Sequence, residues 1–256
     1  RGRLREHFQW NVDIVGEEDV SAAAEVLAVA TDGLRELGLG AADFAARVSD
    51  RRLLTALLSG AGVDAARIPA AFSVIDKIER LPDEKADELF RSEAGLDDEG
   101  IASVRSLLAT TEIAALHEAF GDDAAVGAEL ERLRRYLDLL DAMGLGDFVT
   151  LDLRIVRGLA YYTGIVFELF DRQGELRAIC GGGRYDRLLE LVGGEPLPAV
   201  GFGMGDVVLG ELLASRGLVP AFEPALDYFA VMVSAGERPG GARAAHAPRD
   251  GGTAAA

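Results

Sequence analysis

Strand-forming patterns occur in two blocks of this sequence, and the long stretch between the blocks carries none. Alternating or densely apolar runs predict strands at 4–15, 44–48, 148–156, 161–170, 175–180 and 198–204. Between about residues 79 and 147, apolar side chains recur only at helical spacing, as in Leu130, Leu133, Leu137 and Leu140. The sequence therefore predicts an α+β core that is interrupted by a small all-helical insertion.

Helices are also predicted within the core. A long amphipathic helix begins at Glu18 or Asp19, because the apolar residues that follow keep helical spacing until Gly38 and Gly40 end it. Shorter helices are predicted at 50–59, 63–78, 185–191 and 205–216. These elements predict a core in two parts, 1–73 and 148–220. A helical insertion, 74–147, lies between them, and a C-terminal part, 221–256, follows.

The C-terminal part is expected to be only the start of a domain. Residues 226–234, which follow Pro220 and Pro224, predict a strand that would open this further domain. Residues 236–256 contain no Val, Ile, Leu, Met, Phe, Tyr or Trp. A segment of that composition cannot bury a core, and it is predicted to be disordered.

The net charge bears on partners. With 26 Lys and Arg against 43 Asp and Glu, the formal charge of −17 disfavours a nonspecific binder of nucleic acid or anionic membrane. The acidity is uneven, because residues 79–100 alone carry nine acidic and three basic side chains. We interpret this stretch as a solvated helix face rather than an acidic binding patch. Residues 1–16 and 151–188 are each net +1, so local phosphate binding stays open.

Cysteine and histidine are too sparse for several kinds of site. The single cysteine, Cys180, excludes a disulfide framework within the chain, and the three histidines are far apart, so no metal site is predicted. No apolar run is long enough for a membrane span, and no signal segment leads the chain. A reducing, cytoplasmic location is expected.

The first segment whose residues could bind a ligand combines arginines with amide side chains. Arg1, Arg3 and Arg5 surround a glycine, a composition that fits a loop gripping phosphates. Strand alternation then places Gln9, Asn11 and Asp13 on one face. Three such groups are costly to bury without a ligand. The alternative is an exposed sheet face with solvated polar residues.

A second segment combines an arginine with two tyrosines. Arg157 precedes a glycine at the mouth of the strand 161–170, where it could offer a planar two-pronged donor to a ligand. Tyr161 and Tyr162 could supply an aromatic wall and a hydroxyl. The alternative is an arginine in a structural salt bridge beside two core tyrosines.

A glycine triplet marks the third segment. Gly181, Gly182 and Gly183 would let a ligand approach the backbone closely, or would form a flexible turn between a strand and a helix. Neither this run nor residues 201–205 match Gly-x-Gly-x-x-Gly, and no Gly-x4-Gly-Lys-Ser/Thr is present, so neither a Rossmann dinucleotide site nor a P-loop is supported. Cys180 is interpreted as a small buried residue rather than a nucleophile.

Four segments taken in order resemble one family. GRLREHFQWNVDIVG, RGLAYYTGIVFE, ICGGGRYDRLL and PAVGFGMG are similar to the motifs of histidyl-tRNA synthetases, with the helical insertion in its expected place. The resemblance implies a class II aminoacyl-tRNA synthetase core, an antiparallel sheet flanked by helices, that is normally a homodimer. It implies activation of histidine by ATP, accompanied by Mg²⁺, to histidyl-adenylate, and transfer of histidine to tRNA(His).

The resemblance also carries roles to matching positions. It assigns histidine binding to Gln9, Asp13, Arg157, Tyr161, Tyr162 and Tyr185. It assigns ATP binding to Arg3, Arg5, Gly181, Gly182, Gly183, Gly203 and Gly205. Arg157 matches the arginine at the α-phosphate, where a fixed cation stabilises the charge that develops in the transition state.

The sequence departs from the family in three places. The motif 1 helix and the first arginine of motif 2 would lie before Arg1, the anticodon-binding domain stops after one strand, and Val208 stands where many relatives have the motif 3 arginine. We therefore expect a ligase fragment that is inactive alone. The alternatives are a non-catalytic paralogue, the regulatory subunit of ATP phosphoribosyltransferase in histidine biosynthesis, and a generic α/β binding module.

Overall fold

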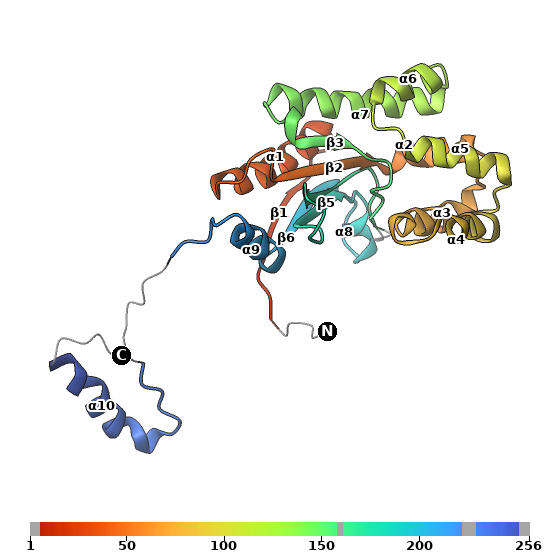
Figure 1. Cartoon of the computed structure of the whole chain (residues 1–256). Helices are drawn as coiled ribbons and strands as arrows, with labels where there is room; N and C mark the ends of the chain where they lie inside the picture. The colour runs from red at the N-terminus through yellow and green to blue at the C-terminus, as the bar shows by residue number, and fades with distance from the viewer. Residues whose placement is uncertain (1–5, 158–160, 222–228, 251–256) are drawn as a thin grey trace. The chain divides into compact units, whose positions relative to one another are not determined.

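The computed structural model describes residues 6–157, 161–221 and 229–250, with side chains to residue 247. Residues Arg1–Leu218 form one compact unit and Val219–Ala256 a second, and each is considered by itself. Figure 1 traces the chain.

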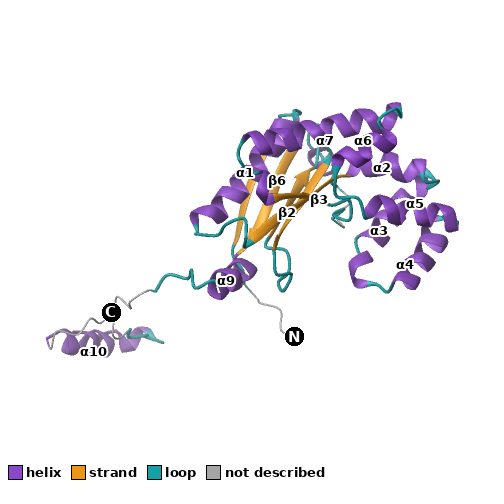
Figure 2. Cartoon of the chain, turned by 45° about the horizontal axis from the view of Figure 1, so that its top comes forward, coloured by secondary structure: helices purple, strands orange, loops and turns teal. Residues whose placement is uncertain are grey.

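A six-stranded sheet forms the centre of the first unit (Figure 2). Its strands are β1 (Gln9–Val15), β2 (Phe44–Asp50), β3 (Val149–Leu151), β4 (Ile165–Asp171), β5 (Cys180–Arg184) and β6 (Ala199–Gly205). Their order across the sheet is β1-β6-β5-β4-β2-β3, and every neighbouring pair is antiparallel except β2 and β3. The α+β class is confirmed, with one parallel pair at the β3 edge.

Helix α1 (Val20–Glu36) covers one face of the sheet and packs against α7 (Ala124–Ala142). It begins where predicted, because the Asp19 carboxylate caps it by accepting from the amide of Ser21 at 2.9 Å. The Trp10 ring lies against Gly33 of this helix, where a Cβ would come within 2.6 Å of the ring. The face that carries Trp10 is therefore the covered face of β1.

Between β2 and β3 the chain is helical, as the sequence predicts. The α-helices before α7 are α2 (Arg51–Gly60), α3 (Ile68–Ile75), α4 (Asp83–Leu89), α5 (Asp98–Leu108) and α6 (Ile113–Phe120). A π-helical turn, Phe90–Ala94, contacts α3, α4 and α5 and joins them. The limits of this insertion as a domain, 74 and 147, stay a prediction.

The prediction for the glycine triplet's surroundings is wrong. No strand forms at 175–179, and β5 instead runs from Cys180 through the triplet to Arg184. Glycine usually weakens a strand, but here a Cβ on Gly182 would come within 2.5 Å of the Gly201 carbonyl oxygen and the Phe167 ring. The glycines made the segment resemble a turn. In the structure they are required because neighbouring strands pack too closely for a Cβ. Helix α8 is also shorter than predicted, at Leu188–Leu191, and α9 covers Asp206–Ser215.

The prediction for the C-terminal unit is also wrong where the structure describes it. Residues 229–234 are not a strand, whereas part of the predicted strand, 226–228, lies outside the described residues. Helix α10 (Arg238–Asp250) occupies most of the segment predicted to be disordered. Lack of apolar residues excludes a buried core. Alanine and arginine favour helix, but Gly240, Gly241 and Pro248 within the same segment disfavour it, so intrinsic propensity alone does not account for α10. Pro239 lies in the first turn, where proline is tolerated.

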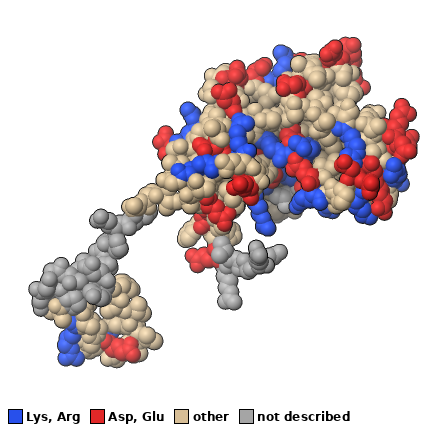
Figure 3. All heavy atoms as spheres, in the orientation of Figure 1, with Lys and Arg blue, Asp and Glu red and all other residues tan. Residues whose placement is uncertain are grey.

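Charged side chains of both signs cover the molecule (Figure 3). Acidic atoms gather at the end of the first unit where α4 and α5 lie, and basic atoms lie among them. Asp83 and Asp87 pair with Arg105, and Asp98 pairs with Arg91, so part of the acidity of 79–100 is neutralised locally. Among the described residues, no helix combines the length and the apolar character that crossing a bilayer requires.

One buried carboxylate ties β2 to the chain beyond β3. Asp152 is 4 % exposed, accepts from Arg47 Nε at 2.5 Å, and accepts from both prongs of Arg154 at 2.8 and 2.9 Å. Burial alone would raise the pKa of this carboxyl, but the hydrogen bonds and charges of the two arginines outweigh burial and lower it below 3.8.

We expect Asp152→Asn to lower the free energy of unfolding by about 2–3 kcal/mol at neutral pH, because it leaves two arginines without their buried partner. A carboxyl whose pKa is depressed by folding stabilises the fold above its unfolded pKa and ceases to do so as pH falls through the folded value. The difference between variant and parent should therefore shrink as pH drops below 3.8. Urea unfolding at several pH values measures it.

The control is Asp32→Asn, which removes half of an exposed ion pair with Arg35 within α1. A surface pair contributes little, so a change of about 0.5 kcal/mol or less is expected. Equal losses in the two variants would contradict the role of the Asp152 pair.

Candidate active site

The open face of the sheet carries the polar residues of β1. Gln9, Asn11 and Asp13 alternate with Trp10, Val12 and Ile14, and the Trp10 side belongs to α1. In the antiparallel register with β6, the polar residues pair with Gly205, Gly203 and Gly201 respectively. Because these alternate residues of β6 are glycines without side chains, they leave a groove beside the polar face of β1.

Polar side chains of β1 occupy that groove. A Cβ on Gly201 would collide with the carboxylate of Asp13, and a Cβ on Gly203 would come within 2.6 Å of Gln9 Nε2 and 3.0 Å of Asn11 Oδ1. The glycines thus let the polar side chains of β1 lie over the neighbouring strand. Hydrogen-bonding groups consequently reach the middle of the sheet.

Arg157 enters the same region from the segment before β4. Its backbone has φ +46°, and it is the one described non-glycine residue with positive φ. A backbone in this region costs free energy and persists where the surroundings require it. Its guanidinium lies over Gly181, where any Cβ would collide with it, and Nη1 donates to Glu168 Oε1 at 3.0 Å. The unusual backbone turns this side chain onto the open face.

The electrostatics around Arg157 leave a hydrogen-bond donor available. Glu168 and Arg157 form a half-buried ion pair. Burial raises the pKa of Glu168, and the charge of Arg157 acts against that rise. Nε of Arg157 is buried and has no hydrogen-bond partner. Arg157 lines the pocket, so the terminal nitrogens of its guanidinium are the donors that can reach a ligand carboxylate or phosphate.

Three tyrosines form the walls of the site. The rings of Tyr161 and Tyr162 have centroids 4.7 Å apart, and Tyr185 stands 6.4 Å from Tyr162 at a steep angle. The guanidinium of Arg157 lies 5.6 Å from the centroid of the Tyr162 ring. The Tyr185 hydroxyl donates to the carboxylate of Asp13. Burial raises the pKa of both Tyr162 and Tyr185, so both hydroxyls stay protonated at neutral pH.

These side chains enclose one pocket of about 330 Å³. It is lined by Gln9, Asn11, Asp13, Arg157, Tyr161, Tyr162, Gly181, Tyr185, Leu188, Gly201, Phe202 and Gly203. All six residues predicted to bind histidine line it, together with Gly181 and Gly203 of the predicted ATP set. Segments separated by more than 140 residues in the sequence therefore meet in one cavity.

The structure describes three of the five remaining residues that are predicted to bind ATP, and none of those three lines this pocket. Arg3 and Arg5 fall outside the described residues. Gly182 approaches the Phe167 ring and the Phe202 side chain, Gly183 is packed against Tyr162, and Gly205 has open space where its Cβ would be. Of these three glycines, Gly205 is the one that leaves room for a ligand at its own position.

Sequence reasoning missed Glu168 as the partner of Arg157, and it did not select Gly201 or Leu188. The strand pattern at 161–170 contained Glu168 as a lone charge among bulky residues, which was the available signal. Cys180 is a small buried residue, as predicted, and burial raises the pKa of its thiol, which keeps it protonated at neutral pH. Val208 packs against the hydrophobic core from α9.

Comparisons with known proteins agree with the family resemblance of the sequence motifs. The family model described as histidyl-tRNA synthetase matches residues 1–205. The chain is 44 % identical over 240 residues to a histidine–tRNA ligase of Opitutus terrae, covering 93 % of this chain and 55 % of that protein. It is 42 % identical over 221 residues to the chloroplastic and mitochondrial histidine–tRNA ligase of Arabidopsis thaliana, covering 86 % of this chain and 44 % of that protein.

A solved structure agrees in fold. The crystal structure of histidyl-tRNA synthetase from Nostoc sp. PCC 7120 superposes with a TM-score of 0.74 at 22 % identity, covering 97 % of this chain and 60 % of that one. The chain spans about half the length of the curated relatives it matches. On the match of the family model to most of its length, the chain belongs to the histidyl-tRNA synthetase family.

Proposed function

We propose that this chain is the catalytic region of a histidine–tRNA ligase, which joins histidine to ATP as histidyl-adenylate and then transfers histidine to tRNA(His). The observation that carries the proposal is the pocket in which Arg157, Asp13 and Tyr185 meet. An arginine, a carboxylate and aromatic walls are the groups that an aromatic, charged amino acid requires.

Histidine fits this pocket by its chemistry. Its carboxylate would receive hydrogen bonds from the terminal guanidinium nitrogens of Arg157, which lines the pocket. The carboxylate of Asp13, held by the Tyr185 hydroxyl, would accept from an imidazole N–H, and Gln9 can donate or accept beside it. A neutral, aliphatic amino acid would offer Asp13 no donor beyond the Tyr185 hydroxyl, so the pocket disfavours it.

The first chemical step follows from the same residues. An oxygen of the histidine carboxylate forms a bond to the α-phosphorus of ATP, the bond from that phosphorus to the bridging oxygen breaks, and pyrophosphate leaves with the electron pair. Charge on the five-coordinate phosphorus would be stabilised by the guanidinium of Arg157. No side chain is required to move a proton, because the attacking carboxylate is already ionised.

Three glycines, two arginines and Mg²⁺ are also proposed to take part in ATP binding. Gly203 and Gly205, with Gly181, would give the nucleotide access to the backbone, as Arg3 and Arg5 would give it charge. Mg²⁺ would arrive on the triphosphate and neutralise part of its charge. The described residues contain no group of three or more His, Cys, Asp or Glu side chains able to form a metal cage, which fits an ion held mainly by phosphates.

We extend the proposal to the partners of the whole protein. Transfer requires the 3′ end of tRNA(His) to reach the adenylate, and a chain of net charge −17 must meet it through local basic segments. The family resemblance supports a homodimer, and the single cysteine supports a reducing, cytoplasmic location. The limits 1–73, 74–147, 148–220 and 221–256 remain the proposed division of the chain.

The test is histidine-dependent exchange of labelled pyrophosphate into ATP by the protein with its full reading frame. Exchange is expected with histidine and not with the other standard amino acids, whereas the 256-residue chain alone is expected to show none. The regulatory-subunit alternative, supported by Val208 in place of an arginine, requires that the full-length protein show no exchange and instead activate an ATP phosphoribosyltransferase. Exchange by the isolated chain would contradict its assignment as an inactive fragment.

A further inference from the structure

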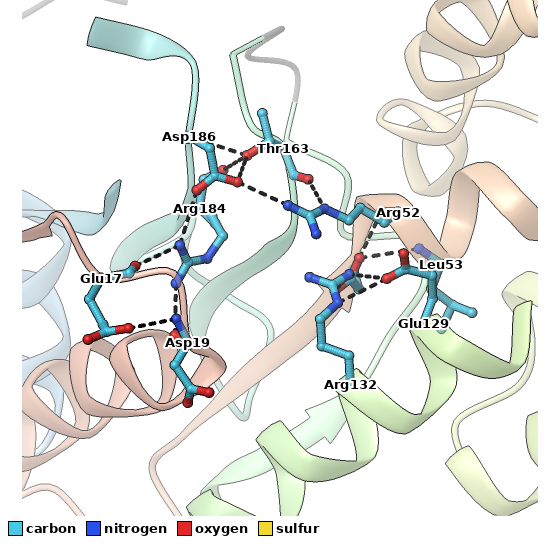
Figure 4. A network of polar contacts seen from close by, with 10 residues as sticks. Glu17, Asp19, Arg52, Leu53, Glu129, Arg132, Thr163, Arg184 and Asp186 are labelled. Atoms are coloured by element: carbon cyan, nitrogen blue, oxygen red, sulfur yellow. Dashed lines mark hydrogen bonds and ion pairs between the residues drawn. The ribbon is translucent and has the colours of Figure 1, made fainter. Parts of the chain in front are cut away.

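Two wall tyrosines of the pocket are each followed by a residue that contacts the other's segment. Thr163 follows Tyr162, and Asp186 follows Tyr185. The Thr163 hydroxyl donates to Asp186 Oδ2 at 2.8 Å, and the amide of Asp186 donates to Thr163 Oγ1 at 3.0 Å. We call this reciprocal pair the Thr163–Asp186 clamp (Figure 4).

The backbone joins the same two segments. The amide of Thr163 donates to the carbonyl of Arg184 at 2.7 Å, just before Tyr185. Each tyrosine is therefore one residue away from a direct hydrogen bond to the other tyrosine's segment. The separation of the two rings, 6.4 Å between centroids, is set across this junction.

Arginines hold the clamp from two sides (Figure 4). Arg52 of α2 donates from Nε to the Thr163 carbonyl at 3.0 Å and from Nη2 to Asp186 Oδ2 at 3.1 Å. Arg184, 4 % exposed, donates from Nη1 to Asp186 Oδ1 at 3.1 Å. Its Nη1 and Nη2 also reach the carbonyls of Glu17 and Asp19, each at 3.0 Å, ahead of α1.

None of these polar groups reaches the pocket. The pocket is lined by Tyr162 and Tyr185 but not by Thr163, Asp186, Arg52 or Arg184. The network joins β5, α2 and the segment before α1 behind the tyrosines. Arg52, Arg184 and Asp186 instead line a separate open pocket of about 380 Å³, together with Glu18 and residues 196–198. The clamp therefore lies outside the tyrosine pocket, where it can fix the position of the walls without touching a ligand bound there.

We propose that the Thr163–Asp186 clamp is a positioning element that fixes the distance between the Tyr162 and Tyr185 walls, and so sets the affinity of the pocket for histidine. The effect on histidine rests on the proposed function, whereas the effect on the two segments does not. Tyr185 also orients Asp13 through its hydroxyl, so a shift of this wall would move the carboxylate's partner. Precise walls restrict a bound ligand to a reactive orientation.

The test compares Thr163→Val, which keeps the shape but removes the hydroxyl, with Thr163→Ser, which keeps the hydroxyl. In full-length protein, Thr163→Val should raise KM for histidine about tenfold, leaving KM for ATP and kcat within about twofold. Thr163→Ser should restore the parent value. A merely structural defect would lower the amount of folded enzyme and thus the apparent kcat, without moving KM.

Amide hydrogen exchange on the 256-residue chain provides a second readout that needs no activity. In Thr163→Val the amide of Asp186 loses its acceptor, so it should exchange about tenfold faster, and Thr163→Ser should not change it. The matched control is Thr55→Val, which removes a hydroxyl bonded to the Arg51 carbonyl within α2. It should alter neither histidine KM nor the Asp186 amide.

The outcomes separate the two proposals. Unchanged exchange at the Asp186 amide would overturn the clamp, and faster exchange with unchanged histidine KM would overturn its role in positioning the walls. If the parent full-length protein shows no histidine-dependent activity, the proposed function fails, the link from the clamp to histidine affinity falls with it, and the exchange measurement still decides whether the clamp holds the two segments together.

Discussion

Replacing Arg157 by alanine should reduce the rate of histidyl-adenylate formation by about 10²–10³-fold in the full-length protein, because removing one well-placed electrostatic donor costs that much in comparable sites. The guanidinium lies over Gly181 beside Tyr162 and has a buried Nε without a partner. Histidine-dependent pyrophosphate exchange measures the rate, with both substrates varied so that kcat and KM are separated.

Folding should change little in Arg157→Ala. The substitution removes the charge that acts against the raised pKa of Glu168, so this carboxyl's pKa rises further and it can take up a proton instead of remaining as an unpaired charge. Thermal unfolding followed by circular dichroism checks this point. Arg157→Lys, which keeps the charge but lacks the planar fork, should lose less activity than the alanine variant.

Arg134→Ala is the matched control for Arg157→Ala. Arg134 is half-exposed on α7 and pairs with Glu131 in the same helix, away from the pocket. Adenylate formation by this variant should equal that of the parent. If Arg157→Ala and Arg134→Ala had the same rate, Arg157 would have no part in the chemistry.

Gly181→Ala should cost about 10²-fold in kcat/KM, although it adds a single methyl group. A Cβ at this position would overlap the guanidinium of Arg157, which must then move away. Displacement of a catalytic group by about 1 Å is enough for a loss of this size. The same exchange assay measures it, and a crystal structure of the variant would show where the guanidinium goes.

The control for Gly181→Ala is Gly210→Ala in α9. A Cβ on Gly210 meets nothing within 4 Å, so this variant should keep full activity and gain about 0.5–1 kcal/mol of stability. Equal activity of Gly181→Ala and the parent would mean that Arg157 acts from another position. Unfolding of Gly181→Ala at the assay temperature would be seen by circular dichroism and separated from a true loss of rate.

The elements that local patterns describe were predictable. Helix α1 begins after its capping residue Asp19 and buries the expected apolar stripe, because capping and helical spacing are properties of neighbouring residues. The helical stretch between β2 and β3 was also predicted, and so was the shared face of Gln9, Asn11 and Asp13. Alternation in a strand depends on the backbone geometry alone.

The predictions that failed depended on contacts between distant segments. The glycine triplet is part of β5 because Phe167 and Gly201 approach Gly182 too closely for a Cβ, which local sequence does not indicate. The helix at Arg238–Asp250 is a separate case, because neither the lack of apolar residues nor the local propensity of a segment that contains Gly240, Gly241 and Pro248 predicts it.

The sequence by itself determined the types of residue in the site and, through the family motifs, their likeness to histidyl-tRNA synthetases. The tertiary structure alone decided that Arg157 turns onto Gly181 and pairs with Glu168, and that Thr163 and Asp186 join the two tyrosine walls. The physical reason is range. Periodicity and capping act over a few residues, whereas these contacts join residues 11 to 24 positions apart that meet only once the sheet has formed.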